Sequence, residues 1–188
     1  AYLAHVRALQ SIGIIKKNEL TKLTKALKVL RKKFIDGKFK LTSKYEDCHS
    51  AIEFYLTKEL GDLGKKVHTG RSRNDQVMVA MRLFAKKNLI EFKTRNKLIA
   101  ETFLNLAKKY KDLPMPGYTH LQRAMPSSWG LWFSSYAESF IDNVDLINNT
   151  IDWVDSNPLG SAAGYGVAIP LNRDLVTKEL GFNRTQIN

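Results

Sequence analysis

The chain has 188 residues, of which 44% are hydrophobic and 10% aromatic, and this composition predicts a packed globular fold of one domain or two small ones. No stretch approaches the roughly 20 uninterrupted apolar residues that span a bilayer, so we expect no membrane partner. The formal net charge of +12 favours anionic partners, but it does not distinguish a polynucleotide from a membrane surface or a small polycarboxylate.

The cysteine and histidine content limits the redox and metal chemistry. The single cysteine, Cys48, allows neither an intrachain disulfide nor a cysteine-based zinc site, and we expect a reducing, cytoplasmic location. The four histidines include no pair four residues apart on one helix, so we expect no metal site and no cofactor. The chain begins at Ala1 inside an amphipathic pattern, without an initiator methionine, and we interpret this start as an interior cut.

Much of the positive charge lies between Lys16 and Lys44, where 11 Lys and Arg residues are opposed only by Glu19 and Asp36. We interpret this stretch as a solvated helix face. It contains few aromatic residues that could stack on bases, and it matches no reader motif, so nucleic acid is not the expected partner.

Two amphipathic helices are predicted in the first third of the chain. The first follows a possible cap at Asn18 and ends before Gly37, and its apolar residues recur at steps of three and four: Leu20, Leu23, Leu27, Leu30 and Phe34. The second carries Ile52, Leu56 and Leu60 and ends at Gly61.

Residues 71–113 contain neither Gly nor Pro and predict one very long helix, about 60 Å at ~1.5 Å per residue. A helix of this length needs partner helices, and we expect them from other subunits. Residues 113–117 end it, and Pro126 with Ser127 and Ser128 is predicted to begin a second long helix that reaches about Asp155. Strand-like alternation is scarce, so the predicted fold class is all-α.

A dense polar segment, residues 68–76, lies at the predicted start of the long helix. Arg71 and Arg73 can each form a bidentate pair with a carboxylate, and Ser72, Asn74 and the free backbone N–H groups of the first turn can donate to an anion. The simpler interpretation is a capped helix, with Ser72 or Asn74 as the cap and Asp75 near the positive end of the helix dipole. The two interpretations are compatible.

Three further segments carry candidate residues. His120, in the connection between the two long helices, is a candidate acid or base beside Thr119 and Gln122, although a lone histidine is more often structural. Asp47, His49 and Glu53 lie near the start of a predicted helix, where an acidic residue can simply favour the helix dipole. The glycines of residues 157–166 fit neither a phosphate loop nor a dinucleotide fingerprint, and we expect a tight, close-packed turn.

Residues 68–77, 116–122, 157–166 and 170–173 together resemble the argininosuccinate lyases of the fumarase and aspartase superfamily, in the same order and with similar spacing. The resemblance covers essentially the whole chain. It implies a small helical N-terminal domain (residues 1–70) followed by the first long helices of a central helix bundle (residues 71–188). It also implies a homotetramer with shared active sites and a role in arginine biosynthesis.

The implied reaction is the reversible elimination of argininosuccinate to arginine and fumarate. A base removes a proton next to a carboxylate, and the enolate-like intermediate needs donors that contribute on the scale of ~3 kcal/mol each. The resemblance implies that His120 is the catalytic histidine and that seven residues bind the substrate or support the site: Asn74, Thr119, Arg73, Ser72, Arg71, Asp47 and Gln122.

The sequence also departs from the family pattern. Family members are more than twice as long, and the loop with the signature Gly-Ser-Ser-x-Met-Pro-x-Lys-x-Asn-Pro, which carries the serine thought to be the base, is absent from these 188 residues. We therefore expect this chain alone to be inactive. The alternatives are a catalytically silent structural relative, as the lens crystallins of this family are, and a basic nucleic-acid-binding module.

Overall fold

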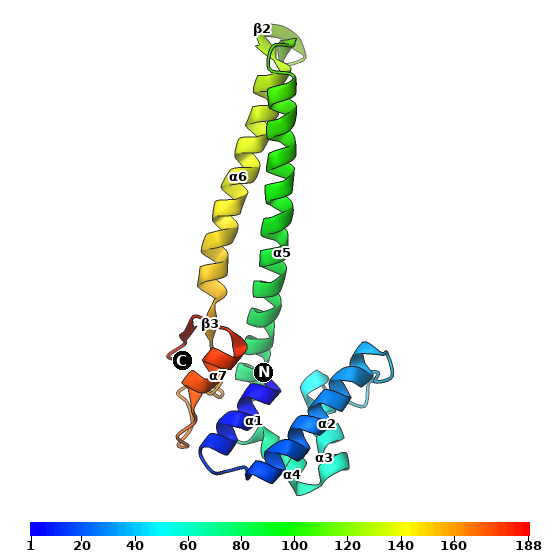
Figure 1. Cartoon of the computed structure of the whole chain (residues 1–188), viewed down its shortest axis with the longest axis vertical. Coiled ribbons are helices and arrows are strands. Elements are labelled where there is room, and N and C mark those ends of the chain that lie inside the picture. Colours follow the sequence, from blue (N-terminus) through cyan, green and yellow to red (C-terminus); the bar gives the residue numbers. More distant parts are fainter. The chain divides into compact units, whose positions relative to one another are not determined.

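The computed structural model describes residues 1–188 and contains seven α-helices, one short 3-10 helix and four short strands (Figure 1). The helices are α1 (Tyr2–Ser11), α2 (Lys17–Ile35), α3 (Cys48–Leu60), α4 (Asp62–Lys65), η1 (Lys66–His68), α5 (Arg73–Lys109), α6 (Trp129–Val154) and α7 (Arg173–Leu180). The strands are β1 (Pro114–Thr119), β2 (Gln122–Ser128), β3 (Ser156–Asn157) and β4 (Arg184–Thr185). The predicted all-α class is confirmed.

The chain divides into two compact units, and the division falls inside α5. The base unit, as we call it, comprises Ala1–Leu83 and Asp155–Asn188, and the hairpin unit comprises Phe84–Val154. None of the helices combines the length and the hydropathy needed to cross a membrane. The domain boundary that we predict between residues 70 and 71 stays a prediction.

The base unit has its main core between α1, α2 and α3. The predicted apolar stripes are confirmed, because Leu23, Leu27 and Leu30 of α2 pack in one buried cluster with Leu9 of α1 and Leu56 of α3. A second cluster joins α1, the start of α5, and α7, and it consists of Ala4, Ala8, Val79, Leu159, Val176 and Phe182. These two cores hold α3 and the start of α5 within one unit.

The predicted cap of α2 is wrong. The helix begins at Lys17, so Lys16 is the cap residue and Asn18 lies inside the first turn. Glu19 accepts a hydrogen bond from the backbone N–H of Lys16 at 2.7 Å, which is the contact that the third helical residue makes in a capping box.

The hairpin unit consists of the remainder of α5, the β1–β2 hairpin and α6, and its two helices run side by side in opposite directions (Figure 1). Phe103 of α5 stacks on Tyr136 and Phe140 of α6 at ring-centroid distances of 5.2 and 5.9 Å. Large apolar side chains nevertheless remain exposed on both helices, among them Phe84, Phe92, Leu98, Leu131, Leu146 and Trp153. Exposed apolar surface on this scale is typical of an interface with another chain.

The connection between the long helices differs from the prediction. Residues 114–128 form an antiparallel β-hairpin, so Pro126 lies in β2 and does not begin α6. The strands are short and carry three prolines, which hides the alternation that marks a strand. Ser128 still caps α6, because its Oγ accepts a hydrogen bond from the N–H of Leu131 at 3.1 Å.

His5 of α1 makes the stability of the base unit depend on pH. Its Nε2–H donates to the carbonyl oxygen of Thr69 at 2.9 Å, and the side chain is buried. Burial, assisted by the charge of Arg71, lowers the pKa of His5 to about 3. The unfolded chain therefore binds one more proton between about pH 3 and the ordinary value of 6.5, so the stabilisation is complete above pH 6.5 and is lost as the pH falls.

We predict that His5→Gln, whose Nε2–H can still donate to Thr69, flattens this dependence. The wild type should lose about 1.4 kcal/mol of unfolding free energy per pH unit below pH 6 more than the variant does. Urea denaturation at pH 7.5, 6 and 5 measures this slope. His120→Gln, which replaces an exposed histidine, is the matched control and should keep the wild-type slope. Equal slopes in all three proteins would contradict the burial argument.

Candidate active site

The polar segment at the start of α5 is a capped helix terminus. Ser72 is the cap: its Oγ accepts from the backbone N–H of Asn74 at 3.3 Å, and Asp75 accepts from the N–H of Ser72 at 3.0 Å. The side chain of Asn74 is exposed, and its Nδ2 lies 3.4 Å from Ser72 Oγ. The helix therefore has an exposed asparagine and a half-buried serine at its positive end.

Asp75 also anchors the glycine-rich turn of residues 157–166. Its second carboxylate oxygen accepts from the backbone N–H groups of Gly160 and Ala162, both at 3.0 Å, and the side chain is 2% exposed. The predicted close packing of this turn is confirmed at Gly160, where a Cβ atom would lie 2.9 Å from Cγ of Arg173, but it is wrong at Gly164 and Gly166, where a Cβ atom would meet no atom within 4 Å. One buried carboxylate thus joins the first turn of α5 to a segment 85 residues away along the chain.

Arg73 is held by three hydrogen bonds and an ion pair within the base unit. Its Nη1 donates to Glu53 at 3.2 Å and to Gln76 at 2.7 Å, and its Nη2 donates to Ser50 at 3.2 Å. Its Nε lies 3.1 Å from a carboxylate oxygen of Asp47 in an ion pair. Because three of the five N–H donors of the guanidinium are hydrogen-bonded and Asp47 already faces its Nε edge, the geometry of Arg73 suits support of the site.

Both carboxylates that hold Arg73 are anionic at neutral pH. Burial acts to raise the pKa of Asp47, but hydrogen bonds from Ser50 and the charge of Arg73 outweigh it and lower the pKa below its ordinary value. Burial likewise acts to raise the pKa of Glu53, and the hydrogen bond from His68 and the charge of Arg73 lower it. Asp47 is also the cap of α3, as its predicted position at a helix start suggested, and it accepts from the N–H of Ser50 at 2.6 Å.

Arg71 is the most buried cation of the segment. It is 7% exposed, and its guanidinium carbon lies 4.3 Å from the ring centroid of Tyr2, whose hydroxyl is 3.1 Å from Nδ1 of His49. The Nε and Nη2 groups of Arg71 find no acceptor within the chain. A cation–π contact compensates only part of the cost of burying this charge.

Thr119, His120 and Gln122 lie at the tip of the β1–β2 hairpin. Thr119 pairs with Gln122, and the two residues between them, His120 and Leu121, have φ angles of 46° and 64°. Two positive φ angles define a type I′ turn, which Asn-Gly usually forms. Both turn residues are exposed, Leu121 by 99%, so no packing within the chain explains this strained backbone.

The eight predicted site residues therefore fall into two groups. The base unit brings together Asp47, Arg71, Ser72, Arg73 and Asn74, and the hairpin unit holds Thr119, His120 and Gln122. Neither Asn74 nor His120 is sealed in an apolar core, because both are exposed.

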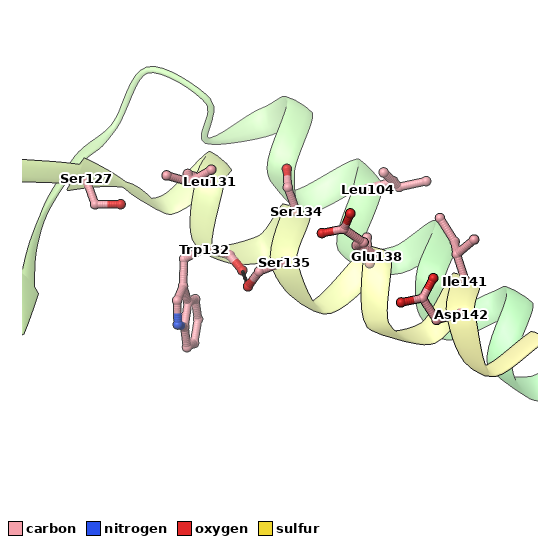
Figure 2. Close-up of a pocket in the computed structure, with 10 residues that line it drawn as sticks. Leu104, Ser127, Leu131, Trp132, Ser134, Ser135, Glu138, Ile141 and Asp142 are labelled. Carbon is pink, nitrogen blue, oxygen red and sulfur yellow. Dashed lines mark hydrogen bonds between the residues drawn. The ribbon is translucent and has the colours of Figure 1, made fainter.

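A groove without any of the predicted site residues lies along α5 and α6 in the hairpin unit, with a volume of about 730 Å³ (Figure 2). Glu138 and Asp142 stand one turn apart on α6 and give the groove negative charge (Figure 2). Such a groove repels a polycarboxylate. No group of three or more His, Cys, Asp or Glu side chains is placed to hold a metal ion.

Two roles at the site were not predicted from the sequence. Glu53 and Gln76 fix the guanidinium of Arg73, and Glu53 lies 20 residues before it, on another helix, where no local pattern points to the pair. Asp75 fixes the turn at Gly160. The sequence did indicate part of this role, since a Ser-x-x-Asp spacing is typical of a capping box. The partners of the second carboxylate oxygen could not be predicted from the sequence.

Residues 1–188 match the model of a protein family described as lyase, so the chain belongs to this lyase family. Its relatives include argininosuccinate lyases. That of Xanthomonas oryzae is 52% identical over 185 residues, which are 98% of this chain and 43% of the relative. That of Xylella fastidiosa is 51% identical over 188 residues, which are 100% of this chain and 42% of the relative. The chain thus spans less than half the length of these proteins.

Solved structures show the same fold. An EDDS lyase in complex with formate matches 100% of this chain and 36% of its own with a TM-score of 0.85 and 27% identity. The β-carboxy-cis,cis-muconate cycloisomerase of Acinetobacter calcoaceticus matches 98% of this chain and 45% of its own with a TM-score of 0.76 and 21% identity, a likeness of fold alone. The resemblance inferred from the sequence segments is confirmed.

We predict that Asp75→Asn destabilises the protein although it preserves the shape of the side chain. One carboxylate oxygen becomes an amide that faces backbone N–H donors, and leaving a buried donor unpaired costs about 1–3 kcal/mol. Urea denaturation should show a loss of about 2–3 kcal/mol in unfolding free energy. Asp36→Asn, at an exposed aspartate, should change it by less than about 0.5 kcal/mol. A loss no larger than in this control would show that the Asp75 contacts contribute nothing to stability.

Proposed function

We propose that the protein containing this chain is an argininosuccinate lyase, which eliminates arginine from argininosuccinate and releases fumarate. The observation that carries the proposal is the terminus of α5, which places an exposed Asn74 and a half-buried Ser72 at its positive end. The argininosuccinate lyases that match the chain at about half of its residues support the same activity.

The α5 terminus has the chemistry that the elimination requires. Loss of a proton next to a carboxylate makes a doubly charged enolate, and donors fixed before the reaction stabilise that charge most. Ser72 and Asn74 supply a hydroxyl and an amide, and the first turn supplies the positive end of the helix dipole. Asp47 and Glu53, the nearby anions, are both paired with Arg73, which offsets part of their charge at the site.

His120 is the proposed catalytic histidine. The type I′ turn keeps both ring nitrogens at the exposed tip of the hairpin, where they can reach a substrate held by another surface. In that position the imidazole can accept a proton from the substrate carbon or donate one to the leaving guanidino nitrogen. Thr119 and Gln122 flank it as proposed substrate contacts.

We further propose that the active site is completed between copies of the protein. The exposed apolar side chains on the hairpin unit, such as Phe92 and Leu146, need covering, and a homotetramer whose long helices pack into one bundle would cover them. We also propose that the boundary between its two domains lies between residues 70 and 71. The proposed protein is cytoplasmic and binds neither nucleic acid nor a membrane. The relatives do not favour a basic binding module.

Release of fumarate tests the proposal. The protein at its full natural length should cleave argininosuccinate, with fumarate measured by its ultraviolet absorbance, and His120→Asn should lower kcat about 10²–10⁴-fold. Residues 1–188 alone should show no turnover, because the proposed base lies in the family loop that this sequence lacks. Absence of turnover in the full-length protein would refute the proposed function, and turnover by residues 1–188 would refute the need for that loop.

A further inference from the structure

We propose that Glu53 is a positioning residue of the candidate site, which fixes the first turn of α5 and thereby Asn74 through the guanidinium of Arg73. The kinetic part of this inference rests on the proposed function. The structural part does not, since it concerns the order of the first turn itself.

A single oxygen of Glu53 gathers three donors. Its Oε1 accepts from Nδ1 of His68 at 2.9 Å, from Nη1 of Arg73 at 3.2 Å and from Nε2 of Gln76 at 3.4 Å. These donors come from η1 and from the first turn of α5, whereas Glu53 lies on α3. The carboxylate therefore connects three elements that have no backbone hydrogen bonds in common at this point.

Gln76 makes the arrangement rigid. It is 1% exposed, its amide N–H donates to Glu53, and its Oε1 accepts from Arg73 at 2.7 Å. Glu53, Arg73 and Gln76 thus form a closed ring of hydrogen bonds, and rotation of any one side chain breaks two of them. Asn74 lies between two residues of this ring along the chain, so the ring constrains the backbone that carries its exposed amide.

The negative charge of Glu53 strengthens these hydrogen bonds in a way that a neutral residue could not. Hydrogen bonds to an ionised acceptor are about twice as strong as neutral ones, and Glu53 is held in its anionic form by the donors that surround it. Without this anion, the Nη1 group of Arg73 is left with Gln76 alone, and the guanidinium keeps only Ser50 and the ion pair with Asp47 as its links to the start of α3. The first turn would then be less ordered before the substrate arrives.

The test uses the full-length protein with Glu53→Gln, which keeps the shape and removes the charge. We expect KM for argininosuccinate to rise about tenfold with kcat changed less than about threefold, because a positioning contact acts on substrate and transition state alike. Hydrogen–deuterium exchange of a peptide covering residues 69–80 should accelerate about tenfold in the absence of substrate. Glu59→Gln makes the same charge change at an exposed position of α3 and should alter neither measurement.

Each outcome decides the inference. Exchange and KM equal to those of Glu59→Gln would overturn it, and so would a fall in kcat at unchanged KM, which would assign Glu53 to the chemistry. If Glu53→Gln does not fold, Glu53→Asp keeps the charge one methylene further away and should give intermediate values, whereas wild-type values would overturn the proposal. If the wild type itself shows no turnover, the proposed function fails and the exchange measurement alone decides the positioning role.

Discussion

The carboxylate of Asp75 joins three backbone N–H groups, those of Ser72, Gly160 and Ala162, that belong to distant parts of the chain. A buried carboxylate is tolerated only where hydrogen bonds compensate its desolvation, so this contact demands that the helix terminus and the glycine-rich turn keep their positions together. The first turn of α5, with Arg73 and Asn74, takes its place from this constraint. The remaining contacts of the candidate site are built on that turn.

Charge at the candidate site is arranged locally and does not follow from the net charge of +12. The exposed lysines of α2 contribute to that total, yet they form no part of the residues grouped around Arg73. What distinguishes the terminus of α5 is the pairing of Asp47 and Glu53 with one guanidinium. The guanidinium thereby offsets part of the charge of two anions that would repel a carboxylate substrate, and the amide of Asn74 remains exposed beside them.

The sequence predicted the features that depend on short spacings. The stripe of α2, the end of α3 at Gly61 and the uninterrupted run of α5 follow from residues three and four apart, which share one helix face. Ser72 as a cap was likewise predictable from its place before an apolar run. These features need no knowledge of the rest of the chain.

Two kinds of feature were not predictable. The β1–β2 hairpin turns through His120 and Leu121, which are not the residues that usually adopt positive φ angles, and its prolines suggested a helix boundary instead. The partners of Arg73 come from α3, and only tertiary packing brings them near. The residue types at the candidate site were therefore predictable. Which of them contact the substrate and which only hold other side chains in place was not.

The separation of the site residues into two units, with both Asn74 and His120 exposed, is the basis of the proposal that copies of the protein complete one another. Mixing two full-length variants, Asn74→Ala and His120→Asn, and refolding them together measures this directly. If a site draws these residues from different copies, some sites of a mixed assembly receive both native residues, and fumarate release should rise well above that of either variant refolded alone. Activity equal to the mean of the two separate variants would contradict the proposal.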